Sequence, residues 1–180
     1  MRRTPRSLRV AAVAVAAVLT TAAAGCSSGP SDAAVSWIGG LCSTMSDFSK
    51  TAQQAPPVDA NAQSFDVQKY VDYFHGLGAA SQKSIDALTA LGPAPVDGGD
   101  AVVSELNNSL TAIKQTFDST ATKLSNTNPD DPSAIRDVLG SVQTELQSKQ
   151  LFNLSSVGNN AELNAAAGQA PACRSLQTQG

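Results

Sequence analysis

The chain has 180 residues, carries a formal net charge of −3, and only 4% of its residues are aromatic. Four of the twelve basic residues lie within the first nine positions, so the remainder holds eight basic and fifteen acidic residues, a net charge of −7. This balance excludes a nucleic-acid-binding surface and a polybasic patch for anionic lipid.

The first 25 residues have the parts of a secretory signal. Arg2, Arg3, Arg6 and Arg9 precede an apolar run over 10–24 and have no acidic residue among them. As a helix with a rise of about 1.5 Å per residue, this run is too short for a hydrocarbon core of about 30 Å. The pattern predicts a signal peptide that is removed on export, not a permanent transmembrane helix.

The signal ends with a cysteine. Residues 23–26, Ala-Ala-Gly-Cys, resemble the lipobox of bacterial lipoproteins, in which small residues precede a cysteine that receives diacylglycerol. Ala23 departs from the leucine that is more usual there. The resemblance implies that Cys26 is the lipidated first residue of the mature protein, with a tether over 26–31. The alternative is ordinary cleavage after Ala24, which would leave a free thiol.

The two remaining cysteines form an even number. In an exported chain an even number of cysteines predicts a disulfide bond, here between Cys42 and Cys173, which would close a loop over most of the domain. The alternative is two buried free thiols. A residue count of 155 after the signal favours one domain over 32–180.

The first predicted helix covers 32–52, with Ser31 as its N-cap. Its apolar residues recur at steps of three and four, the period of one helical face, and Cys42 lies beside that face. Trp37 belongs to this face and is interpreted as a core residue. The members of the face are Ala34, Trp37, Ile38, Leu41, Met45 and Phe48.

A proline-containing loop precedes the second predicted helix, over 64–91. Its apolar stripe has a weak middle at Gly76, Gly78 and Ser81, where small side chains would leave room for a cavity between helices. The stripe consists of Val67, Tyr70, Val71, Phe74, Leu77, Ile85, Leu88 and Leu91.

The third predicted helix begins with Asp100 as N-cap and carries a heptad seam. Its seam residues are Val103, Leu106, Leu110, Ile113, Phe117 and Leu124. The fourth begins with the N-cap Asp131 and first-turn Pro132, and Glu145 and Lys149 form an i,i+4 pair on its solvent side. Its apolar face consists of Ile135, Val138, Leu139, Val142 and Leu146.

The C-terminal segment after Leu151 has a weaker pattern. A short helix is predicted over 160–167, and the disulfide would hold the tail through Cys173. The predicted fold is therefore all-α: an antiparallel four-helix bundle with a disulfide-pinned C-terminal tail.

The layout resembles the small exported helical lipoproteins that are common in actinobacteria. The shared features are an alanine-rich signal, the lipobox Cys26, a Trp-x4-Cys pattern from Trp37 to Cys42, and Cys173 close to the C-terminus. The resemblance implies an all-α protein at the outer face of the cytoplasmic membrane, attached through its N-terminal lipid. It implies no activity.

The residue inventory disfavours an enzyme. His75 is the only histidine, and Asp72 lies three positions before it, but a two-metal carboxylate site needs a second histidine and more glutamates. No Gly-x-Ser-x-Gly motif occurs. We expect no catalytic residue, no metal ligand and no cofactor, and interpret His75 as a solvated or hydrogen-bonded residue beside the core.

Three functions remain as hypotheses. The first is a non-enzymatic helical interaction domain that binds an envelope protein partner. The second is a carrier or sensor of an apolar small molecule held within the bundle. The third, a hydrolase dependent on His75, has the least support.

Overall fold

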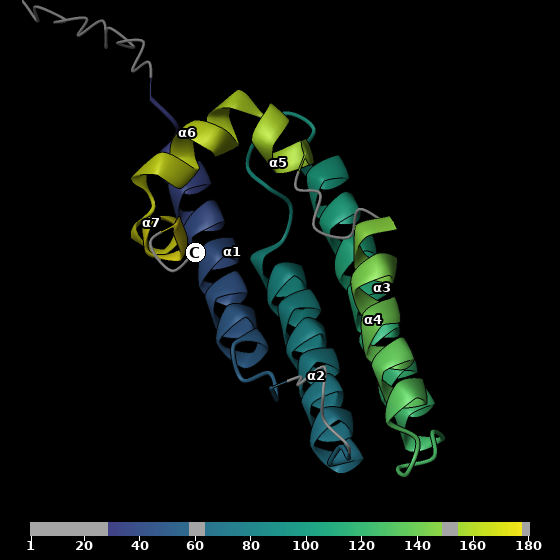
Figure 1. The fold of residues 1–180 in the computed structure, drawn as a ribbon. Helices are drawn as coiled ribbons and strands as arrows, with labels where there is room; N and C mark the ends of the chain where they lie inside the picture. The colour runs from purple at the N-terminus through teal and green to yellow at the C-terminus, as the bar shows by residue number, and fades with distance from the viewer. Residues whose placement is uncertain (1–28, 58–63, 149–154, 178–180) are drawn as a thin grey trace, which may run out of the picture.

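The structure, a computed structural model, describes residues 29–57, 64–148 and 155–177 (Figure 1). Within these residues the regular structure consists of seven helices and no strand, which confirms the all-α prediction. The helices are α1 (Asp32–Ala52), α2 (Val67–Leu91), α3 (Gly99–Ser125), α4 (Pro132–Ser148), α5 (Ser155–Asn159), α6 (Ala161–Gln169) and α7 (Pro171–Gln177). The predicted signal, Cys26 and the tether up to residue 28 lie outside the described residues.

The long helices form an antiparallel bundle. Helix α2 packs between α1 and α3, and α4 runs back along α3 (Figure 1). The short helices α6 and α7 lie against α1 at the end where α1 begins. Among the described residues, no helix is long and apolar enough to cross a membrane.

Two helix starts follow the predicted capping pattern. The Ser31 hydroxyl accepts a hydrogen bond from the backbone N–H of Ala34 at 3.2 Å. The Asp131 carboxylate accepts from the backbone N–H groups of Ser133 and Ala134, both at 3.1 Å. These bonds satisfy N–H groups that have no partner inside the helix. The hydrogen bond from the Ser133 hydroxyl, together with these two backbone bonds, lowers the pKa of Asp131.

Two other helix starts differ from the prediction. Helix α2 begins at Val67 and not at Ser64, with Asp66 in the N-cap position. Helix α3 begins before Asp100, because Gly98 takes the N-cap position with a left-handed φ of 75°. Asp100 is therefore in the first turn, where its carboxylate still interacts favourably with the helix dipole.

The core divides into two clusters along the bundle. The upper cluster surrounds the start of α1 and includes side chains from α6 and α7. The lower cluster surrounds the end of α1 and includes side chains from α4. Most predicted core residues belong to one of them, although Met45, Val67, Ile85, Leu91, Val103, Val138, Leu139 and Leu146 are only partly buried.

The C-terminal segment is more regular than the predicted tail. It contains α5, α6 and α7, and α6 begins after Asn160, whose side chain accepts from the backbone N–H of Leu163 at 3.0 Å. Cys173 of α7 is bonded to Cys42 of α1, with their Cα atoms 5.0 Å apart. The predicted disulfide is confirmed.

The predicted pair between Glu145 and Lys149 includes a residue outside the described ranges. Among the described residues Glu145 contacts α3, where its carboxylate lies 3.0 Å from the Lys123 ammonium. Both side chains are partly exposed, so we expect this ion pair to contribute less than about 1 kcal/mol.

The disulfide gives the first testable prediction. Its loop covers 131 positions, for which the loop-entropy model gives a stabilisation of about 4 to 5 kcal/mol. Reduction should lower the melting temperature of the exported chain, measured by circular dichroism. A Cys42→Ser/Cys173→Ser variant is the control, because reductant should not shift its melting. An equal shift in both proteins would contradict the stabilising role.

Adjacent glycines at the start of α3 give the second prediction. A Cβ at Gly99 would overlap the backbone carbonyl of Ala94, whereas a Cβ at Gly98 would meet no atom and suffer only left-handed strain. Gly99→Ala should cost about 2 kcal/mol or more in denaturant unfolding, and Gly98→Ala about 1 kcal/mol. Gly140→Ala, in open space on α4, should be neutral or stabilising. A larger loss of stability in Gly98→Ala than in Gly99→Ala would contradict this prediction.

Candidate functional site

A cavity of about 920 Å³ lies in the lower half of the bundle. Four helices and the loop after α1 contribute its walls. Its lining consists of Phe48, Ala52, Ala55, Pro56, Tyr70, Tyr73, Phe74, Leu77, Phe117, Leu139, Val142, Gln143, Leu146 and Gln147. Twelve of these fourteen side chains are aromatic or aliphatic, and none is ionised at neutral pH.

The cavity results from the way α1 is covered. Helices α6 and α7 pack on α1 near its start, where the disulfide holds α7. Helix α4 packs along α3 and makes no comparable backbone contact with α1 or α2 among the described residues. The end of α1 and the facing side of α4 therefore stand apart, and the apolar space between them is the cavity.

Three phenylalanines form the inner wall. The ring of Phe117 lies 6.3 Å from that of Phe48 and 6.1 Å from that of Phe74, measured between centroids. These distances are typical of favourable aromatic pairs. The three rings are almost fully buried and come from α1, α2 and α3, so the wall is held by packing between three helices.

Two tyrosines attach the end of α1 to α2. The Tyr73 hydroxyl donates to the carbonyl oxygen of Ala52 at 2.9 Å, and the Tyr70 hydroxyl donates to that of Pro57 at 2.7 Å. Burial raises the pKa of both phenols, so they stay neutral at physiological pH. Because each hydroxyl proton is engaged with backbone, these tyrosines line the cavity chiefly with their rings.

The polar side of the lining is small. Gln143 and Gln147 lie one turn apart on α4, and both are exposed. They are the only lining side chains with an amide group. Two uncharged hydrogen-bonding groups therefore belong to the solvent-exposed part of the lining.

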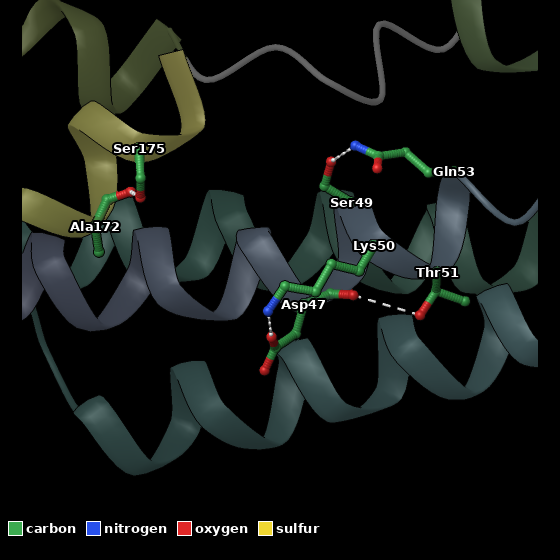
Figure 2. Close-up of polar contacts among 7 residues, drawn as sticks. All are labelled: Asp47, Ser49, Lys50, Thr51, Gln53, Ala172 and Ser175. Carbon is green, nitrogen blue, oxygen red and sulfur yellow. Dashed lines mark hydrogen bonds and ion pairs between the residues drawn. The ribbon is translucent and has the colours of Figure 1, made fainter. Parts of the chain in front are cut away.

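The charged groups at the end of α1 interact within that helix (Figure 2). The Lys50 ammonium lies 2.8 Å from the Asp47 carboxylate, which lowers the pKa of Asp47. The Thr51 hydroxyl donates to the Asp47 carbonyl at 3.3 Å, and the Gln53 amide donates to the Ser49 hydroxyl at 3.5 Å. None of these side chains lines the cavity.

The predicted position for a cavity is wrong. Gly78 lies so close to α3 that a Cβ there would overlap the carboxylate of Asp118. Ser81 is fully buried and donates to the Leu77 carbonyl at 2.9 Å. The small residues bring α2 and α3 together, and the cavity lies nearer the start of α2, beside Tyr70 and Tyr73.

The apolar stripe predicted for α2 did not include Tyr73, which lies in the lining of the cavity. The available signal was the spacing of Tyr70, Tyr73, Phe74 and Leu77, which makes an apolar face wider than a bundle seam requires. Neighbouring residues of a helix point in different directions, so Tyr73 and Phe74 together widen this face, and both contribute to the lining.

The other predicted residues lie away from the cavity. Trp37 is buried in the upper cluster, where its indole N–H donates to the Gly92 carbonyl at 3.1 Å, as expected for a core residue. His75 is exposed, as is Asp72, whose carboxylate accepts from the Gln68 amide at 2.7 Å. Within the described ranges, no group of three histidine, cysteine, aspartate or glutamate side chains is placed to hold a metal.

Comparisons of the chain with protein-family models, curated proteins and solved structures gave no match. The cavity combines a packed aromatic wall, an aliphatic face on α4 and an uncharged polar edge, which together suit an apolar molecule.

Proposed function

We propose that this protein is an exported lipoprotein that binds a lipid-like apolar molecule in the cavity between α1, α2, α3 and α4. The observation that carries the proposal is the cavity itself, about 920 Å³ with a lining of twelve apolar or aromatic side chains and two amides. Ligand pockets in proteins commonly measure about 300 to 1,000 Å³ and have predominantly apolar walls with few polar groups. The protein would act as a carrier or sensor of this molecule, without catalysis.

The size of the ligand follows from the energetics of association. Binding costs at least about 4 kcal/mol in lost translational and rotational freedom, and buried apolar surface returns about 25 cal/mol per Å². A ligand must therefore bury more than roughly 160 Å² of apolar surface before any net affinity appears. Long alkyl or acyl chains satisfy this condition, whereas small apolar solutes bind weakly.

The walls favour binding without large rearrangement. Phe48, Phe74 and Phe117 are fixed by contacts among three helices, and the hydroxyls of Tyr70 and Tyr73 hold the end of α1. A preformed site loses less conformational entropy when its ligand binds. The rigid side of the cavity would thus supply affinity, while α4, whose main helix contact among the described residues is with α3, is the wall more free to adjust.

The location of the protein is the second part of the proposal. The lipobox resemblance of residues 23–26 supports lipidation of Cys26, and a net charge of −7 after the signal leaves no electrostatic route to an anionic membrane. We place the domain at the outer face of the cytoplasmic membrane, attached through the acyl chains of Cys26.

Partial filling of the cavity should weaken ligand binding. Ala52→Trp places a large side chain in the lining, so it should weaken binding of a neutral apolar fluorescent dye at least tenfold, about 1.4 kcal/mol. Fluorescence titration measures the affinity, and circular dichroism checks that helicity is retained. Native mass spectrometry of the protein from its own membranes should show bound lipid in the parent chain and less in the variant.

The matched control is Ala101→Trp, at an exposed position of α3 outside the cavity lining. It should bind the dye and retain lipid like the parent chain. If Ala52→Trp also binds normally, or if the parent chain binds neither dye nor lipid, the carrier proposal is wrong and binding of a protein partner becomes the better hypothesis.

Loss of Cys26 should release the protein from membranes. Cys26→Ser removes the proposed acylation site, so the exported chain should move from the detergent phase to the aqueous phase in a partition experiment. Cys42→Ser/Cys173→Ser, which keeps Cys26, should stay in the detergent phase. An unchanged partition of Cys26→Ser would refute lipid anchoring.

A further inference from the structure

We infer that the ligand of the cavity carries an uncharged polar head group, as in a long-chain alcohol or a monoacylglycerol, and that Gln143 and Gln147 bind this head. The inference rests on the proposed function and specifies the ligand class of the same site. It follows from three features: the absence of charge in the lining, the engagement of the tyrosine hydroxyls, and the position of the two amides.

Among the described residues, the lining offers no partner for an ionised head group. None of its fourteen side chains is a lysine, arginine, histidine, aspartate or glutamate. Transfer of a carboxylate or ammonium from water into an apolar site is strongly unfavourable unless an opposite charge or several hydrogen bonds compensate it. A lipid with a charged head would therefore have to leave that head in solvent, which shortens the part of the chain that the cavity can bury.

The tyrosines are poor partners for a head group. Their hydroxyl protons are donated to the carbonyl oxygens of Pro57 and Ala52, at 2.7 and 2.9 Å. Diverting either proton to a ligand would detach the end of α1 from α2. The hydrogen-bond donors left for a ligand in the lining are thus the amides of α4.

Gln143 and Gln147 are suited to this role by chemistry and position. Each side-chain amide offers two donors and one carbonyl acceptor, so a pair can bind hydroxyl and ester groups of either polarity. The two residues are four positions apart and therefore share one face of α4, which also carries the lining residues Leu139 and Leu146. Both amides are exposed, and the structure records no hydrogen bond for either of them within the described residues.

The surroundings disfavour an anionic head in particular. The carboxylate of Glu145 lies on α4 between the two glutamines in sequence, and the Lys123 ammonium is already 3.0 Å from it. The chain after the signal has fifteen acidic and eight basic residues, so its field repels anions over its surface.

Competition against a neutral fluorescent dye tests the inference. The exported Cys26→Ser chain is used, because it carries no acyl group of its own that might occupy the cavity. The competitors share one chain length and differ in head group: a primary alcohol, the monoacylglycerol, the fatty acid above its pKa, and the alkyltrimethylammonium. The alcohol and the monoacylglycerol should displace the dye at concentrations at least tenfold lower than either ion.

Two variants distinguish the contribution of the amides to binding from that of the apolar lining. Gln143→Lys supplies the missing positive charge, so it should improve displacement by the fatty acid, relative to the alcohol, at least tenfold. Gln143→Leu/Gln147→Leu removes both amides, so the alcohol and the monoacylglycerol should displace the dye less effectively, relative to the affinity of the dye, while dye binding persists. Gln115→Lys, at an exposed position of α3 outside the lining, is the control and should change neither ratio.

The outcomes distinguish the two proposals. If the fatty acid or the ammonium competes as well as the alcohol, or if the glutamine variants change nothing, the head-group inference is overturned and the carrier function stands. If neither the dye nor any competitor binds the cavity, both proposals are overturned.

Discussion

The structure depends on how the apolar face of α1 is covered along its length. One helix would normally cover such a face from end to end in a four-helix bundle. Here different helices cover the two parts of α1. Helices α6 and α7 pack on its first part, and α4 faces its last part without packing closely on it among the described residues. The disulfide between Cys42 and Cys173 fixes this division, because it places α7 where a fourth helix would otherwise lie. The core cluster at one end is closed, and the cluster at the other end contains the cavity.

Local features of the fold were predictable because they depend on contacts a few residues apart. Ser31 and Asp131 bond to N–H groups two or three positions later, so a short pattern identifies both helix starts. The disulfide was predictable for a different reason, since only Cys42 and Cys173 remain once Cys26 is assigned to the lipobox. The start of α3 was misplaced because Gly98 adopts a left-handed conformation, for which the pattern of apolar residues holds no information.

The site was not predictable at the level of single residues. A cavity depends on the distance between α1 and α4, which are far apart in sequence and do not pack together. Small residues such as Gly78 and Ser81 permit either an empty space or a close approach of helices, and in this fold they permit the approach of α2 to α3. The lining residues of α4, in turn, have the same pattern as ordinary core residues; what differs is the space that separates them from α1 in the described part of the chain.

If the cavity binds a ligand as proposed, the length of α1 would set the distance between the anchor and the place of ligand exchange. The helix has 21 residues and is therefore about 30 Å long, and the cavity lies at its end, beside Phe48 and Ala52. The N-terminus of the domain and the cavity are thus separated by roughly the thickness of a hydrocarbon core. A domain standing upright on an N-terminal anchor would hold its bound molecule away from the membrane surface, in reach of a second protein. To exchange that molecule directly with the anchoring bilayer, the same domain would have to lie on its side.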